Sequence, residues 1–196
     1  MNVALVDSGG ANIGSVRYAL QRLGVEAALT SDAARIRAAD RVILPGVGAA
    51  APAMARLREN GLVDVLRSLR QPVLGVCLGM QLLCAHSEEG GIDGLGVIDA
   101  RVQRFGDREG RRVPHMGWNR VEAVVSNRMF AADGGKGWAY FVHSYAVPVC
   151  VATLATCDYG GAFSAAIGRD NFLGVQYHPE RSAAFGMATL RNFLAS

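Results

Sequence analysis

The sequence contains a single lysine, Lys136, and it lacks long apolar runs, low-complexity tracts and internal repeats. Its 196 residues carry a formal net charge of only +3, and the basic residues, nearly all arginine, are scattered. This distribution argues against a nucleic-acid surface. The longest apolar candidate, residues 73–85, is interrupted by Gln81 and is too short to span a membrane. Without a repeat or a clean linker, the chain is expected to form one domain over residues 1–196.

The four cysteines, at positions 77, 84, 150 and 157, lack the spacing of a disulfide framework, and no signal peptide is recognisable. We therefore expect a cytoplasmic protein with reduced thiols and with Cys84, Cys150 and Cys157 in its core. No metal site is predicted, because a structural zinc site needs four closely spaced ligands and the Cys, His and Glu residues do not supply them. The sequence also predicts no cofactor, since the glycines before residue 12 lack a full phosphate-loop fingerprint.

Strand and helix patterns alternate through the first 85 residues. Strands are expected at residues 2–6, 27–30, 41–44 and 72–76, and helices at 12–24, 32–39, 51–58, 62–69 and 80–85. Further strands follow without intervening helices, at 99–105, 119–125, 138–142, 151–157, 163–167 and 172–176, before a helix at 183–195. The pattern predicts a three-layer α/β/α fold with a central, mostly parallel sheet that is extended by antiparallel strands. A ligand site is expected beyond the carboxyl ends of the parallel strands.

The segment 72–81 joins an apolar strand to a helical pattern through Gly75, Cys77 and Gly79. A G-x-C-x-G at a strand-to-helix turn is the cysteine form of a nucleophile elbow. Side chains two residues either side of the cysteine would collide in so sharp a turn, and glycines remove the collision. The turn also places the sulfur at a helix N-terminus, where partial positive charge favours the thiolate. The alternative interpretation is a small buried cysteine at an ordinary glycine-rich turn.

A cysteine nucleophile needs a base, and the base needs an orienting group. His178 follows the expected strand 172–176 and precedes Pro179 and Glu180. Proline disfavours helix for the residue before it, and residues two apart in an extended segment point to the same side. Taken alone, this segment also fits a turn with an incidental acid. Together with the elbow, it predicts a triad of Cys77, His178 and Glu180.

Residues 75–81 (Gly-Val-Cys-Leu-Gly-Met-Gln) and 176–180 (Gln-Tyr-His-Pro-Glu) resemble the class I, triad-type glutamine amidotransferase family over nearly the whole chain. Residues 114–119 and 140–145 narrow the resemblance to glutaminase subunits that serve a cyclase in histidine biosynthesis. The resemblance implies that Cys77 attacks the carboxamide of L-glutamine and forms a γ-glutamyl thioester that water hydrolyses. It makes His178 the base and then the acid toward ammonia, and Glu180 the residue that orients His178.

The resemblance also gives roles to other matched positions. The backbone N–H groups of Val47 and Leu78 would form the oxyanion hole, and the glycines beside Val47 suit a peptide that reorients. Substrate recognition would fall to Gly48, Gln81, Glu89, His143, Ser144 and Tyr145, with the adjacent Glu88 as an alternative to Glu89. Ser8 and Ala50 stand where the family more usually has Tyr and Phe, which leaves open the packing near residues 45–48.

Because the released ammonia must not escape into water, the resemblance implies a partner, a (β/α)8-barrel cyclase subunit in a heterodimer. That barrel must be a separate chain, since 196 residues leave no room for it. Candidates for the docking face are Asn12 and the expected loop 114–119 with His115 and Trp118, although Trp118 also fits a core position. Two alternatives stay open. One is a glutaminase subunit of anthranilate, aminodeoxychorismate or pyridoxal phosphate synthesis, and the other is an inert regulatory module of the same fold.

Overall fold

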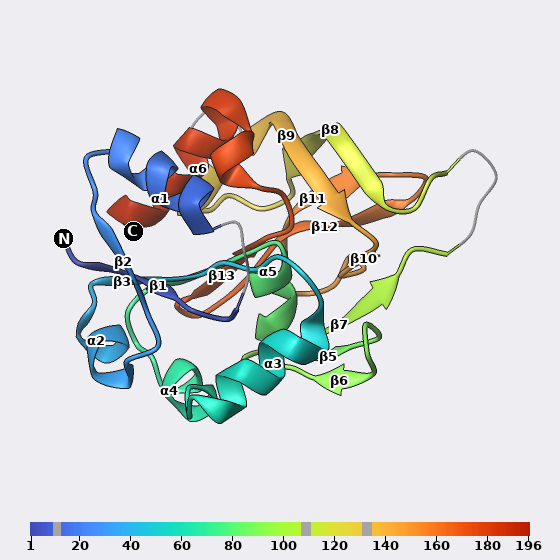
Figure 1. The fold of residues 1–196 in the computed structure, drawn as a ribbon. Helices are drawn as coiled ribbons and strands as arrows, with labels where there is room; N and C mark the ends of the chain where they lie inside the picture. The colour runs from blue at the N-terminus through green and yellow to red at the C-terminus, as the bar shows by residue number, and fades with distance from the viewer. Residues whose placement is uncertain (10–12, 107–110, 131–134) are drawn as a thin grey trace.

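The computed structural model describes residues 1–9, 13–106, 111–130 and 135–196, and a nine-stranded sheet forms its centre (Figure 1). The 3-10 helices η1 (Arg128–Phe130) and η3 (Pro179–Arg181) also lie within the described ranges. In spatial order the strands are β2 (Ala27–Thr30), β1 (Val3–Val6), β3 (Arg41–Leu44), β4 (Val73–Val76), β13 (Phe172–Val175), β12 (Ala162–Arg169), β11 (Thr153–Asp158), β8 (His115–Ala123) and β9 (Lys136–His143).

The sheet consists of a parallel half and an antiparallel half. Strands β2, β1, β3, β4 and β13 pair in parallel, whereas β12, β11, β8 and β9 continue the sheet by antiparallel pairing. The expected α/β class and the added antiparallel strands are confirmed, although the sheet is evenly mixed rather than mostly parallel. Strand β13 joins the halves, because it pairs in parallel with β4 and antiparallel with β12.

Helices cover both faces of the sheet (Figure 1). On one face lie α1 (Ile13–Arg22) and α6 (Ala183–Ala195); on the other lie α2 (Ala33–Ala38), α3 (Ala50–Glu59), α4 (Val63–Arg67) and α5 (Leu78–Leu83). The alternation along β1 explains how one strand serves two cores. Val3 and Leu5 belong to the cluster under α1 and α6, while Ala4 and Val6 belong to the cluster under α3 and α5. No helix in the described ranges has both the length and the apolar character that crossing a membrane requires.

A second sheet of four strands was not expected from the sequence. It contains β10 (Tyr145–Ala146), β7 (Ile98–Arg104), β5 (Cys84–Ser87) and β6 (Ile92–Asp93). The helix expected over residues 80–85 is therefore wrong at its end, because α5 stops at Leu83 and β5 begins at Cys84. Tertiary hydrogen bonds replace the helical ones, since the carbonyls of Leu83 and Cys84 accept from the backbone N–H groups of Val97 and Gly96.

Candidate active site

Cys77 lies at the sharp turn between β4 and α5, at the carboxyl edge of the parallel strands. Its backbone has φ 52° and ψ −109°, a conformation that residues with a side chain rarely adopt. A Cβ atom on Gly75 would lie 2.6 Å from the carbonyl carbon of Gly79, and one on Gly79 would lie 1.8 Å from the carbonyl oxygen of Leu44. Both positions therefore exclude any side chain, and the turn presents the cysteine in the strained form expected of an elbow.

His178 and Glu180 follow β13, the strand that pairs with β4. The Cys77 N–H donates to the carbonyl of Val175 (2.8 Å), which holds the elbow beside the end of β13. The His178 N–H donates to the carbonyl of Tyr140 (2.9 Å), which fixes His178 against β9. His178 Nδ1 lies 2.9 Å from Glu180 Oε1, with both side chains at most 4% exposed.

The surroundings of His178 favour its protonated form. Burial alone lowers the pKa of His178, but its contacts with Cys77 and Glu180 outweigh burial and raise that pKa to about 10. Glu180 occupies Nδ1, and Nε2 is buried with no hydrogen-bond partner of normal geometry among the described residues. Nε2 is therefore the ring atom available to exchange a proton with the thiol or with a leaving group.

The loop 45–48 follows β3 and packs directly on the elbow. A Cβ atom on Gly46 would lie 2.5 Å from the backbone nitrogen of Gly79 and 2.6 Å from Leu78 Cβ. Gly46 thus allows the loop to approach the start of α5, where the peptide following the nucleophile lies. Gly48 has φ +100°, a value suited to glycine, and space around its Cα is open.

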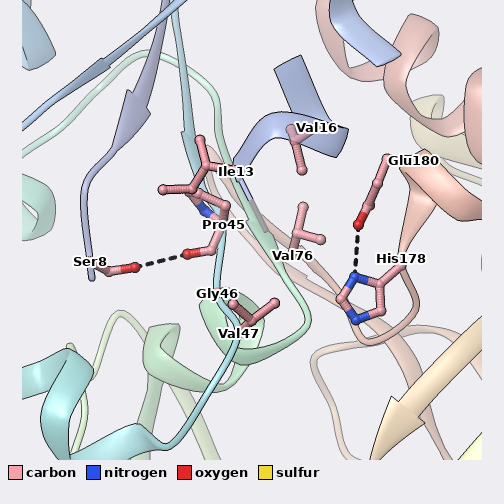
Figure 2. A pocket seen from close by; sticks show the side chains of 9 residues that line it. All are labelled: Ser8, Ile13, Val16, Pro45, Gly46, Val47, Val76, His178 and Glu180. Atoms are coloured by element: carbon pink, nitrogen blue, oxygen red, sulfur yellow. Dashed lines mark hydrogen bonds and ion pairs between the residues drawn. The ribbon is translucent and has the colours of Figure 1, made fainter. Parts of the chain in front are cut away.

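Ser8 fixes the other side of this loop. Its buried hydroxyl donates to the carbonyl of Pro45 at 3.0 Å. Figure 2 shows this bond, and it shows the loop facing His178 and Glu180 across a small pocket bordered by α1. The pocket holds about 10 Å³, roughly the space for one water molecule. Ser8, which stands where the family more usually has Tyr, therefore anchors loop 45–48 by a polar contact.

A larger cavity of about 370 Å³ opens on the other side of the loop. It brings together Cys77, His178 and all the residues that the sequence predicts for the oxyanion hole and substrate contacts. Its lining consists of Val47, Gly48, Cys77, Leu78, Gln81, Glu89, Pro114, Val142, His143, Ser144, Tyr145 and His178. Pro114 and Val142 were not predicted individually, although both lie in the two later motifs. Cavities of this size bind small molecules in other proteins.

The structure separates the two neighbouring glutamates. Glu89 Oε2 accepts from the backbone N–H of Ala50 (2.9 Å), which places the carboxylate beside loop 45–48 in the cavity wall. Glu88 Oε2 instead accepts from the backbone N–H of Arg104 (2.8 Å) and does not line the cavity. Of the two alternatives, Glu89 is therefore the one positioned to contact a ligand.

Two buried histidines, His143 and His115, support the part of the cavity wall that residues 142–145 form. His143 Nδ1 lies 2.8 Å from the carbonyl of Tyr145, which accepts only, so Nδ1 carries the proton. His143 Nε2 must then accept from His115 Nδ1 at 3.1 Å, and His115 Nε2 accepts from the amide of Asn119 at 3.3 Å. Burial lowers the pKa of His115 to about 4 and that of His143 to about 3, so both rings are neutral.

The family model described as class-I glutamine amidotransferase matches residues 4–196. The chain belongs to the class I glutamine amidotransferase family. Among curated proteins, this amidotransferase is 53% identical over 193 residues to "Imidazole glycerol phosphate synthase subunit HisH" of Xanthomonas axonopodis pv. citri, covering 98% of this chain and 96% of the relative. It is 54% identical over 192 residues to the protein of the same name in Xylella fastidiosa, with the same coverage.

Solved structures show the same fold for this amidotransferase. One described as a glutamine amidotransferase has a TM-score of 0.75 at 23% identity and covers 98% of this chain and 97% of its own. A glutamine amidotransferase from Thermotoga maritima has a TM-score of 0.66 at 18% identity, covering 100% of this chain and 83% of its own.

The expected docking residues of the amidotransferase have three different outcomes. Asn12 lies outside the described residues. His115 is buried in the structure, stacked between Phe141 and Tyr159 at ring distances of 4.8 and 3.9 Å, so its placement on an exposed face is wrong. Trp118 is 51% exposed, which excludes the core alternative for it. Residues 115–119 are also part of β8 rather than a loop, and strand alternation sends His115 inward and Trp118 outward.

The amidotransferase has a further buried polar residue near Cys77 that the sequence did not single out. Gln176 follows β13, two residues before His178, and its side chain reaches the sulfur. The same-side rule applied to His178 and Glu180 would have found it, because Gln176 and His178 are also two apart. Among the described residues, no cluster of three or more His, Cys, Asp or Glu side chains is arranged to hold a metal ion.

Proposed function

We propose that this amidotransferase is the glutaminase subunit of imidazole glycerol phosphate synthase and delivers ammonia to a cyclase subunit in histidine biosynthesis. The observation that carries the proposal is the cavity, which combines an elbow cysteine, a buried His–Glu pair and polar recognition groups. The relatives that bear this name align with nearly the whole chain, which supports the specific pathway over other ammonia-using synthases. An intact set of Cys77, His178 and Glu180 argues against an inert regulatory module.

In the proposed reaction, Cys77 Sγ attacks the carboxamide carbon of glutamine while His178 holds the thiol proton. His178 then gives that proton to the nitrogen as the C–N bond breaks, so ammonia leaves and a γ-glutamyl thioester remains. Water attacks the thioester with His178 as base, which releases glutamate and restores the thiol. Glu180 holds Nδ1 throughout, so that Nε2 remains directed at the reacting atoms.

The tetrahedral intermediate carries an oxyanion that needs donors preorganised around it. The backbone N–H groups of Leu78, directly after the nucleophile, and of Val47 are our candidates, since both residues line the cavity beside Cys77. The substrate's α-ammonium group would lie near the Glu89 carboxylate and the side-chain oxygen of Gln81, and its α-carboxylate near the backbone at Ser144 and Tyr145.

The docking face proposed for the cyclase is the outer side of the β8–β9 hairpin, at the edge of the large sheet. Met116, Trp118 and Trp138 are 63%, 51% and 60% exposed there. Trp118 lies opposite Tyr140 with ring centroids 6.2 Å apart, and Arg181 stands 4.4 Å over the Tyr140 ring. Exposed aromatic and arginine side chains of this kind are typical anchors of protein interfaces.

This face is next to the cavity. Met116 pairs across the hairpin with Val142, which lines the cavity. A partner with a (β/α)8 barrel that covers Met116 and Trp118 would therefore also cover the exit of the cavity and receive ammonia before water does. We place the resulting heterodimer in the cytoplasm, where the thiol of Cys77 stays reduced.

The test is glutamate release by the chain alone, with a cyclase subunit of imidazole glycerol phosphate synthase, and with that subunit plus its nucleotide ligand. We expect strong stimulation by the loaded partner and none by subunits of anthranilate synthase. Cys77→Ala should abolish turnover, whereas Cys150→Ala, at a half-buried thiol outside the cavity, should retain it. Stimulation by a subunit of another synthase would refute the proposed pathway. Turnover by Cys77→Ala would refute the assignment of Cys77 as the nucleophile.

A further inference from the structure

A buried amide contacts the sulfur of Cys77. Gln176 has no exposed surface, and its Nε2 donates to Cys77 Sγ at 3.6 Å. Besides His178, the sulfur contacts the carbonyl of Val142 at 3.9 Å, an acceptor that suits the thiol but would repel a thiolate. Cys77 is itself only 7% exposed, so water gives a thiolate at this position little support.

The direction of the Gln176 amide follows from the contacts of its neighbours. The carbonyl of Tyr145 can only accept, so the Gln81 side-chain atom 3.0 Å away from it must be the donor, Nε2. That same nitrogen lies 3.0 Å from Gln176, which must therefore present its oxygen, Oε1. With Oε1 committed to Gln81, the Gln176 group that faces the sulfur is the NH2 donor.

The Tyr145 carbonyl, from which this series of hydrogen bonds starts, is itself held in place. The Tyr145 carbonyl accepts a second bond, from Nδ1 of the neutral His143 at 2.8 Å. Tyr145 also lies in β10, where it pairs with Arg104 of β7. The amide orientation is thus determined by an anchored backbone group.

We propose that Gln176 is an additional catalytic residue that stabilises the thiolate of Cys77 through its amide N–H, and that Gln81 positions this amide in addition to any contact with glutamine. The inference rests on the proposed role of Cys77 as nucleophile. The same donor meets the sulfur a second time, when the thiolate leaves the thioester during hydrolysis. His178 and Gln176 then supply the charged and the neutral donor to one sulfur atom.

The test is the pH dependence of Cys77 alkylation by iodoacetamide, measured on the isolated chain by peptide mass spectrometry. This readout needs neither glutamine nor a partner. Cys150 serves as the internal reference, while burial raises the pKa of Cys84 and Cys157 to about 12 and keeps both thiols unreactive. Gln176→Met keeps the length of the side chain and removes the donor.

We expect Gln176→Met to move the midpoint of the Cys77 profile upward by about one pH unit or more, which is a tenfold change or larger, because a hydrogen bond to an ion is lost. Gln81→Met should move it less, and the double variant no further than Gln176→Met, since Gln81 acts through Gln176. The Cys150 profile should stay unchanged in all three variants.

A merely structural role would lower the melting temperature and leave the Cys77 midpoint in place, and that result overturns the proposal. If Gln176→Met does not fold, Gln81→Met alone decides, because an unchanged midpoint there also overturns it. The proposed function can fail independently. A wild-type chain with an alkylation profile that depends on Gln176, but no glutamine hydrolysis with any partner, would refute the function and retain this inference.

Discussion

The contact between Gly46 and the elbow makes Gly46→Ala an informative perturbation. The new Cβ would lie 2.5 Å from Gly79 N and 2.6 Å from Leu78 Cβ, whereas ordinary contacts begin near 3.4 Å. Both neighbours belong to the start of α5, which is completely buried and cannot move away. The loop 45–48 must therefore retreat by roughly 1 Å and take the Val47 peptide with it.

The size of the effect follows from this displacement. A misplacement of about 1 Å costs about 10²-fold in rate, and loss of one oxyanion donor costs about 10²–10³-fold. We expect kcat for glutamine hydrolysis to fall about 100-fold. KM should change little, because Gln81 and Glu89 hold the other end of the substrate in our proposal. Overpacking of this kind should also reduce the free energy of unfolding by about 1–3 kcal/mol.

The assay is glutamate release at saturating glutamine with the activating partner present, alongside urea denaturation. Gly14→Ala in α1 is the matched control, since within the described part of the chain its Cβ would meet only the Tyr18 ring, at 3.9 Å. That variant should keep wild-type kcat and gain up to about 1 kcal/mol of stability from helix propensity. A folded Gly46→Ala enzyme with kcat within about twofold of wild type would refute the assignment of loop 45–48 to the oxyanion hole.

Glu180→Gln should lower the pKa of His178, because the buried carboxylate helps to raise it, and kcat should fall by about 10²–10⁴-fold in glutamate-release assays. Acid sensitivity should come partly from the neutral pair His115 and His143, whose pKa values are depressed by burial. Their contribution to stability is present above pH 6.5 and is lost as the pH falls toward 4. For His115→Phe we therefore expect a lower urea midpoint than wild type above pH 6.5, and a smaller decrease of that midpoint between pH 6.5 and 4. An equally steep decline would contradict this. Trp118→Ala should change the free energy of unfolding by no more than about 0.5 kcal/mol but should weaken the stimulation of turnover by the partner. Unchanged stimulation would show that Trp118 does not belong to the docking face.

The parts of the site that could be predicted are those in which local chemistry constrains the sequence. The elbow needs Gly75 because of contacts with the backbone of Gly79 and Met80, so this part of the motif carries its own structural reason, whereas Gly79 is required by the more distant carbonyl of Leu44 in β3. The link between His178 and Glu180 is also local, although the segment is not extended throughout as expected, because His178 is extended and Glu180 lies in η3. By contrast, β5 is set by hydrogen bonds from Gly96 and Val97, which no local pattern near residues 80–85 contains.

The error at His115 has a different cause. Treating residues 114–119 as a loop discarded the alternation that separates inward from outward side chains. Within β8 that alternation places His115 in the core and Trp118 on the surface. The same periodicity in residues 176–180 would have directed Gln176 toward Cys77. In both cases the two-residue spacing of side chains is present in the sequence itself.

The contacts of loop 45–48 restrict how the oxyanion donor that we propose, the Val47 N–H, can move. At one end, Ser8 holds the carbonyl of Pro45, and Gly46 packs against the backbone of Gly79, so this end cannot shift as a body. At the other end, Gly48 has φ +100° and no atoms within 4 Å of a Cβ position. The Val47 N–H belongs to the peptide between Gly46 and Val47, so its reorientation must occur by rotation about Gly46 ψ and Val47 φ, and the backbone freedom of Gly48 lets the following residues take up the change. We therefore propose that a partner at the cavity mouth acts on this rotation through Gly48, the end of the loop that does not pack on the elbow.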